Sequence, residues 1–225
     1  MLEPRPPVTA AEVDRFAREG FVVLRSVLDP DGVAAARDRI WDALPERFRR
    51  DDARTWQGLV EDESGTRDLL ERKGRVKLRG ALRTDPALLA LLPENAVIRD
   101  LVATLLAPRV VAPPQTVRGI YLTFPMPELP ESTGHVDLHD YAIGAVAYLD
   151  EVPRHGGGLL VWPGSQHDRS IPVEARQHEP SDRALELPGR AGDVVLYDRH
   201  LVHAPGRNRL PHVRAALLCD FRLAE

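Results

Sequence analysis

The sequence predicts one α+β domain whose β-rich part is a double-stranded β-helix of the jelly-roll type. Two observations predict this class: helical periodicity in the first half, and short β-rich segments broken by proline and glycine after about residue 107. Helices followed by strands indicate that the helices pack against the sheet. We therefore expect a single domain over residues 1–225, in which residues 1–106 are mainly a helical support and residues 107–225 form the jelly-roll core.

The first half begins with a short amphipathic helix. Thr9 followed by Glu12 forms a capping box, and Gly20 stands where a glycine that terminates a helix belongs. Three further elements are expected in this half: a strand over residues 21–28, a helix that starts after Asp29 with Pro30 in its first turn, and a helix over about residues 94–106.

The second half contains short segments rich in β-branched and aromatic residues. They are expected to be strands because turn-forming residues bound each of them. The segments are VRGIYLTF, AIGAVAYL, GLLVW, ALELP, GDVVLYD and RAALLCDF.

The composition of the chain argues against two classes of binding partner. The 30 basic and 34 acidic residues give a net charge of −4, so neither nucleic acid nor a membrane surface is an expected partner. Cys219 is the only cysteine, which excludes an intramolecular disulfide and favours a cytoplasmic location. The N-terminal residues MLEPRPPVTA lack the apolar stretch of an export signal. We expect a small-molecule substrate, and the sequence leaves the oligomeric state open.

Three residues have the pattern of a metal site. In a strand, His135 and Asp137 project from the same face because they are two residues apart. His203 follows a later predicted strand, GDVVLYD, which can lie beside the first in a jelly roll. Two imidazoles and one carboxylate leave coordination positions open, an arrangement that suits iron(II) and O₂ chemistry, although zinc also accepts these ligands.

A basic residue accompanies this pattern. Arg214 opens the apolar segment RAALLCDF, where a buried guanidinium needs an anionic partner. It could bind the distal carboxylate of 2-oxoglutarate with two parallel hydrogen bonds while the other end of that molecule chelates the metal. The alternative is an ion pair with a carboxylate of the protein.

With these motifs in place, the sequence resembles the phytanoyl-CoA dioxygenase family of iron(II)/2-oxoglutarate-dependent oxygenases over nearly its whole length. The opening FAREGFVVLRSVLDPDGV is similar to the family's N-terminal helix-strand-helix. The remaining stretches that carry the resemblance are HVDLHDY, GGGLLVWPGSQH and GDVVLYDRHLVHAPGRNRLPHVRAAL.

The resemblance implies a cofactor, a cosubstrate and a reaction. It implies that O₂ oxidatively decarboxylates 2-oxoglutarate to succinate and CO₂ at iron(II), with hydroxylation of a substrate C–H bond as the default outcome. The residues it assigns are the iron ligands His135, Asp137 and His203, which are also the catalytic residues, and the 2-oxoglutarate ligand Arg214.

Further residues are assigned through the same resemblance. Lys77 is similar to a basic residue that some members bring to 2-oxoglutarate, and Ile120 and Val146 are expected on the wall of the cosubstrate pocket. Halogenating relatives have a small residue at the position of Asp137, so the resemblance implies a hydroxylase and not a halogenase. Residues near the triad in sequence that could contact substrate are Arg118, His139, Asp140 and Tyr141, while Asn208 is expected to fix a loop.

Two other functions remain open from the sequence. A cupin-like metal hydrolase or isomerase would share the barrel and part of the ligand set without consuming 2-oxoglutarate. A non-catalytic small-molecule-binding barrel would keep the fold but not the turnover. The H-x-D pair and the extra Arg214 favour the oxygenase over the cupin, and the complete ligand set favours it over the binding module.

Overall fold

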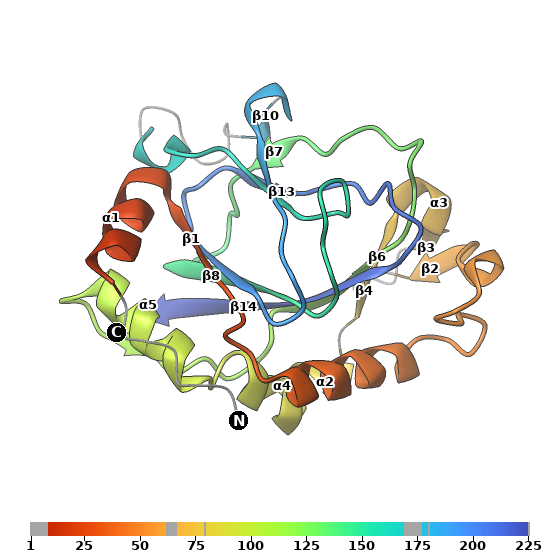
Figure 1. Ribbon diagram of the computed structural model, residues 1–225, viewed down its shortest axis with the longest axis horizontal. Helices are drawn as coiled ribbons and strands as arrows, with labels where there is room; N and C mark the ends of the chain where they lie inside the picture. The colour runs from red at the N-terminus through yellow and green to blue at the C-terminus, as the bar shows by residue number, and fades with distance from the viewer. Residues whose placement is uncertain (1–8, 62–66, 79, 169–176, 180, 225) are drawn as a thin grey trace.

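The computed structural model describes residues 9–61, 67–78, 80–168, 177–179 and 181–224. Two antiparallel sheets pack face to face, and helices cover the outer face of the larger one (Figure 1). The larger sheet has the order β1-β12-β8-β14-β6-β4 with β5 paired to β14, and the smaller has the order β10-β7-β13-β9-β11. The predicted α+β class and the jelly-roll architecture are confirmed.

The helices are α1 (Ala10–Glu19), α2 (Pro30–Asp42), α3 (Leu70–Lys73), α4 (Pro86–Leu91) and α5 (Ala96–Leu106). The strands of the larger sheet are β1 (Phe21–Leu24), β4 (Arg75–Leu78), β5 (Val111–Ala112), β6 (Gly119–Thr123), β8 (Ile143–Tyr148), β12 (Val194–Asp198) and β14 (Arg214–Leu223). Those of the smaller sheet are β7 (Gly134–His135), β9 (Leu159–Val161), β10 (Gln177–Glu179), β11 (Leu185–Leu187) and β13 (His203–Pro205), and β2 (Leu59–Glu61) pairs with β3 (Arg67–Leu69).

The helix ends follow the predicted capping residues. The capping box of Thr9 and Glu12 is present, and Gly20 terminates α1 at φ 82°, a left-handed conformation that glycine adopts without steric cost. Asp29 caps α2 by accepting a hydrogen bond from the backbone N–H of Gly32. The expected helix over residues 94–106 is confirmed as α5.

The strand predicted over residues 21–28 is shorter than expected. It ends at Leu24 because the chain turns at Ser26, which has φ 49° and whose backbone N–H donates to the buried carboxylate of Asp193. Strand β1 forms one edge of the larger sheet, and β4 forms the other edge. The first half of the chain therefore supplies strands as well as the helical support.

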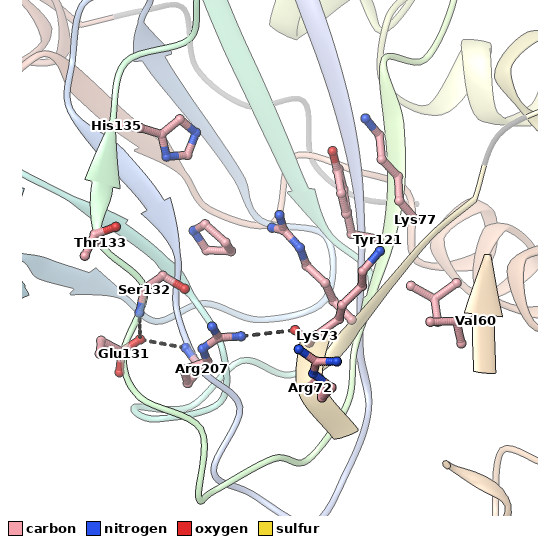
Figure 2. Close-up of a pocket in the computed structure, with 13 residues that line it drawn as sticks. Val60, Arg72, Lys73, Lys77, Tyr121, Glu131, Ser132, Thr133, His135 and Arg207 are labelled. Carbon is pink, nitrogen blue, oxygen red and sulfur yellow. Dashed lines mark hydrogen bonds between the residues drawn. The ribbon is translucent and has the colours of Figure 1, made fainter. Parts of the chain in front are cut away.

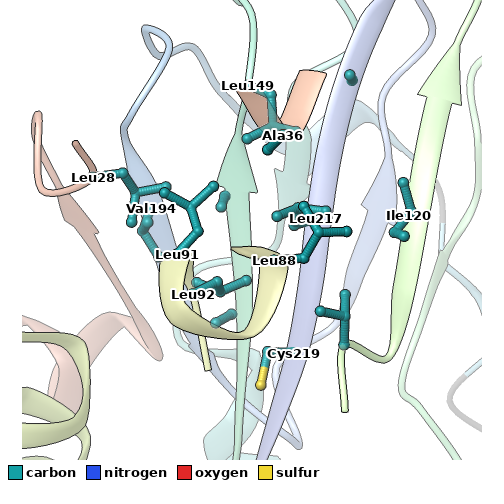
Figure 3. Packing of buried hydrophobic residues seen from close by; sticks show 14 of the residues in the cluster. Leu28, Ala36, Leu88, Leu91, Leu92, Ile120, Leu149, Val194, Leu217 and Cys219 are labelled. Atoms are coloured by element: carbon teal, nitrogen blue, oxygen red, sulfur yellow. The ribbon is translucent and has the colours of Figure 1, made fainter. Parts of the chain in front are cut away.

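The main hydrophobic core lies between the helices and the larger sheet (Figure 3). Strand β14 contributes alternate residues to this layer: Ala215, Leu217, Cys219 and Phe221. The opposite faces of the larger sheet's strands point toward the smaller sheet, where a second cluster includes Val146 and Tyr148 from β8 with Leu159 and Val161 from β9. The space between the two sheets contains the candidate site.

The structure bears only in part on the expectations about an export signal and about the membrane. The N-terminal residues 1–8, which carry most of the argument against an export signal, lie outside the described residues. Within the described ranges, every helix falls short of the length and hydrophobicity that a bilayer crossing requires.

Candidate active site

The predicted metal ligands come together at one end of the space between the sheets. One ligand atom from each of His135, Asp137 and His203 lies within 4.8 Å of the other two. His135 and His203 are paired residues of the neighbouring strands β7 and β13. Strand β7 ends at His135, so Asp137 does not lie in a strand as predicted, but Val136 between them is buried on the other side of the smaller sheet. The extended backbone therefore continues long enough to keep both ligands on one face.

The spacing and orientation of the three side chains fit one metal ion. His135 Nε2 lies 3.6 Å from Asp137 Oδ1, and His203 Nε2 lies 3.6 Å from Asp137 Oδ2. Each imidazole nitrogen is therefore close to the carboxylate but beyond direct hydrogen-bonding distance. His203 Nδ1 lies 3.0 Å from the backbone carbonyl oxygen of Leu201. A proton on Nδ1 would bind this carbonyl and leave the Nε2 lone pair for a metal, which is the usual outer contact of a metal-binding histidine.

Asp137 is held as a carboxylate. Burial by itself would raise the pKa of its carboxyl group, but contacts with His135 and His203 and the charge of Arg118 outweigh burial and hold the pKa well below its usual range. Arg118 Nη1 donates to Asp137 Oδ2 at 3.0 Å, and the Tyr141 hydroxyl donates to the same oxygen at 2.9 Å. Two of the residues considered as substrate contacts thus bind the carboxylate of Asp137, the predicted metal ligand.

Two other residues contact Arg118 or the predicted metal ligands, and neither of them was predicted from the sequence. The hydroxyl of Tyr197 accepts a hydrogen bond from Arg118 Nη2 at 3.1 Å, and the Tyr197 ring lies 4.6 Å from that of His203 between centroids. Asp220 on β14 lies 3.1 Å from Arg118 Nε. Arg118 is therefore fixed between two carboxylates, and its position fixes Asp137.

We expect Tyr141→Phe to weaken iron(II) binding by about tenfold, since loss of an outer contact to a metal ligand typically costs 10–100-fold in metal affinity. Asp137 keeps the bond from Arg118, so the lower end of this range applies. Anaerobic iron(II) titration measures the dissociation constant. Tyr121→Phe is the matched control, because Tyr121 and Asp137 line one cavity and the structure shows no bond from the Tyr121 hydroxyl to Asp137. Equal affinities for Tyr141→Phe and the wild type would contradict the assigned contact.

Arg214 shares a cavity with the triad. This inner cavity has a volume of about 110 Å³, and its lining includes His135, Asp137, His203, Thr123, Val146, Arg214 and Leu218. The Arg214 side chain is 4% exposed, and its guanidinium lies 5.1 Å from the centroid of the Tyr148 ring. Burial lowers its pKa, and the neighbouring Tyr148 opposes that shift. Within the described residues, Arg214 Nε and Thr123 Oγ1 are buried without a hydrogen-bond partner, so the cavity offers two donors to an anionic ligand.

The other predicted pocket residues are placed differently. Val146 lines the inner cavity opposite Leu218, its partner in the neighbouring strand. Ile120 does not line it: the side chain belongs to the core between the helices and the larger sheet (Figure 3). Its neighbour Tyr121 points to the cavity instead, because successive side chains of β6 alternate between faces. Lys77 lies outside the inner cavity, with Nζ 5.2 Å from the centroid of the Tyr121 ring.

Two larger cavities flank the inner one. The entrance cavity, of about 710 Å³, shares Arg75, Tyr121, His135 and Pro205 with it. Figure 2 shows His135 on one side of the entrance cavity and Tyr121 with Lys77 on the other. The side cavity, of about 740 Å³, reaches the triad through Asp137 and Arg118. The candidate metal site therefore borders both larger cavities, through His135 and through Asp137.

A jelly roll with two histidines and one carboxylate beside a buried arginine has the features of a mononuclear non-haem metal enzyme. The chain belongs to the phytanoyl-CoA dioxygenase family, whose sequence model matches residues 16–216. The resemblance noted in the sequence is thereby confirmed.

One relative is similar in sequence, and two solved structures are similar in fold. The uncharacterized protein Rv1501 of Mycobacterium tuberculosis is 27% identical over 212 residues, which are 90% of this chain and 71% of the relative. The carbocyclase SnoK of nogalamycin biosynthesis, described as non-haem and α-ketoglutarate dependent, superposes with a TM-score of 0.65 at 20% identity, covering 95% of this chain and 83% of SnoK. EctD from S. alaskensis, crystallised with 2-oxoglutarate and 5-hydroxyectoine, gives 0.63 at 20% identity, covering 99% and 78%.

Proposed function

We propose that this protein is an iron(II)/2-oxoglutarate-dependent oxygenase that hydroxylates an unactivated C–H bond of a small molecule and releases succinate and CO₂. The observation that carries the proposal is the inner cavity, where three side chains able to bind a metal face the same space as a buried guanidinium that has no carboxylate partner among the described residues. His135, Asp137 and His203 would hold the iron. The relatives support the choice of cofactor, since EctD was also crystallised with iron bound.

The residues of the inner cavity fit the requirements of this chemistry. Iron bound there would supply the redox chemistry that couples O₂ to the decarboxylation of 2-oxoglutarate and the oxidation of the substrate. Arg214 would bind the distal carboxylate of 2-oxoglutarate, and Thr123 on the adjacent strand would donate a second hydrogen bond. Val146 and Leu218 would exclude water from the inner cavity, which both of them line.

Hydroxylation is the proposed outcome among several that this class supports. SnoK is described as a carbocyclase, so the same class of enzyme also catalyses ring formation. Asp137 would occupy the third ligand position, which in halogenating relatives is left open for chloride, and we therefore propose that this protein does not halogenate. The oxidised position would be selected by the residues of the entrance and side cavities, because the inner cavity, of about 110 Å³, is much smaller than either of them.

We expect purified protein with iron(II), ascorbate, O₂ and 2-oxoglutarate to form succinate slowly even without a primary substrate, and faster when the correct substrate is added. Chromatographic detection of succinate measures both rates. The controls are the same protein under argon and the same protein with excess chelator. A metal-loaded protein that forms no succinate with any candidate metabolite, yet hydrolyses or isomerises one of them, would favour the cupin-like alternative.

A further inference from the structure

We propose that the entrance cavity binds an anionic group of the primary substrate through Arg75 and Arg207. This inference rests on the proposed function, because it names the class of substrate that would reach the metal from this side. The anionic group is a phosphate or a carboxylate attached to the part of the molecule that is oxidised.

The lining of the entrance cavity is strongly cationic. Among the described residues, Glu131 is the only carboxylate that lines it, and the cations that line it are Arg72, Lys73, Arg75, Lys77 and Arg207. The carboxylate of Glu131 already contacts other groups of the protein. Its Oε1 accepts from the backbone N–H of Arg207 at 2.9 Å, and its Oε2 lies 3.6 Å from Arg209 Nη2 (Figure 2 shows the first contact).

Arg207 is held in place without a countercharge on its guanidinium. Its Nε donates to the carbonyl of Pro130 at 2.8 Å, and its Nη1 donates to the carbonyl of Lys73 at 3.1 Å. These bonds fix the plane of the guanidinium, and within the described part of the chain the structure shows no carboxylate in an ion pair with it. Burial lowers the pKa of Arg207 and the positive charge of Arg75 lowers it further, while the charge of Glu131 opposes this shift only in part.

Arg75 connects the two cavities. Its guanidinium carbon lies 5.5 Å from the centroid of the Tyr121 ring, and the residue lines both the entrance cavity and the inner cavity. Within the described residues, the structure shows no carboxylate paired with Arg75. Its charge also acts unfavourably on Arg214. The guanidinium of Arg75 therefore repels those of Arg207 and Arg214, and an anion bound between Arg75 and Arg207 would offset the first of these repulsions.

The side cavity has a smaller imbalance: the cations Lys77, Arg83, Arg118 and Arg222 line it together with the carboxylates of Asp137 and Asp220. Its buried cation, Arg118, contacts both Asp137 and Asp220. An anion would therefore gain much less there than in the entrance cavity. Because His135 lines the entrance cavity as well as the inner one, a molecule anchored at Arg75 and Arg207 can extend from this anchor toward the metal site.

Passage of 2-oxoglutarate, itself a dianion, is a second use that a cationic entrance could serve. The experiment therefore keeps the cosubstrate site saturated. Protein loaded anaerobically with iron(II) and excess 2-oxoglutarate is titrated by calorimetry with phenyl phosphate, with benzoate and with the neutral benzyl alcohol. We expect at least one anion to bind, benzyl alcohol to bind at least about tenfold more weakly, and binding of the anion to weaken as NaCl is raised.

Variants locate the bound anion. Arg75→Gln and Arg207→Gln should each weaken it by about tenfold or more, the loss typical of a charge-assisted hydrogen bond. Arg222→Gln is the matched control, since Arg222 lines the side cavity, and it should change the affinity by less than about twofold. Protection from phenylglyoxal, mapped on the wild-type protein by mass spectrometry, should be seen at Arg75 and Arg207 and not at Arg222. This readout does not depend on the folding of any variant.

The outcomes separate the two proposals. Equal binding of the neutral probe, equal weakening by Arg222→Gln, loss of anion binding as 2-oxoglutarate is raised, or no binding of either anion would each overturn the substrate-anchor assignment. Succinate formation with any of these results would leave the oxygenase intact and remove only the anchor. Anion binding at Arg75 and Arg207 in a protein that forms no succinate would instead remove the oxygenase proposal.

Discussion

Asp137→Ala should reduce iron-dependent succinate formation by at least about 100-fold, because it removes a proposed metal ligand and loss of an outer contact alone costs about 10–100-fold in metal affinity or activity. Asp137 is the one carboxylate among the three clustered ligands, and its ionised form is strongly favoured at neutral pH. Its loss would leave two imidazoles to hold iron(II). Iron content after anaerobic loading and the rate of succinate formation are the two measurements.

Folding of this variant needs its own control. Asp137 also contacts Arg118, but Arg118 retains Asp220, so we expect the far-ultraviolet circular dichroism of Asp137→Ala to match the wild type. His203→Ala should lose activity to a similar degree. His167→Ala is the matched control, because His167 is exposed and distant from the triad in sequence, and it should retain full activity. Normal iron content and turnover in both ligand variants would refute the assigned metal site.

Arg214→Met should raise the KM for 2-oxoglutarate by about 10-fold to 150-fold, the equivalent of the 1.5–3 kcal/mol that a hydrogen bond to a charged group contributes. Methionine fills a similar volume without the charge, so the β14 backbone should keep its place. The KM comes from succinate formation at varied 2-oxoglutarate. The rate at saturation should fall less than the KM rises, because the metal ligands are unchanged.

Stability distinguishes this role from a structural one. Arg214 is a buried cation whose Nε lacks a partner among the described residues, so removing the charge relieves a desolvation cost when 2-oxoglutarate is absent. We expect the melting temperature of Arg214→Met without cosubstrate to equal or exceed that of the wild type. We also expect added 2-oxoglutarate to stabilise the wild type more than the variant. A variant with an unchanged KM and a lower melting temperature would show that Arg214 serves packing alone.

Much of the fold could be predicted because local signals agreed with the tertiary structure. Capping residues located α1 and α2, and apolar runs bounded by turns located β8, β12 and β14. The triad was found because its residue types are chemically distinctive, although β7 is too short for the strand argument to hold at Asp137. There, an extended chain outside the sheet preserved the alternation on which the prediction depended.

The errors came from features that a single stretch of sequence does not determine. The resemblance gave Ile120 as a pocket residue, whereas the register of β6 with β14 places Thr123 opposite Arg214 and so turns Tyr121 and Thr123 to the cavity. The alternation of polar and apolar residues in β6 was the available signal. No such signal joined Arg75 to Arg207, since strand pairing and loop packing bring these distant residues to one cavity.

Strand β14 also sets a limit on how this scaffold can diversify. Arg214 and Asp220 lie on the same face of one strand, an even number of residues apart, while the residues between them alternate into the helical core. If one residue were inserted or deleted between these two positions, every later side chain of β14 would move to the opposite face of the sheet. Apolar side chains would then point toward Arg118, which Asp220 contacts in this structure. The spacing of Arg214 and Asp220 along β14 is therefore fixed by the sheet, and changes in chain length are expected only outside the segment between them.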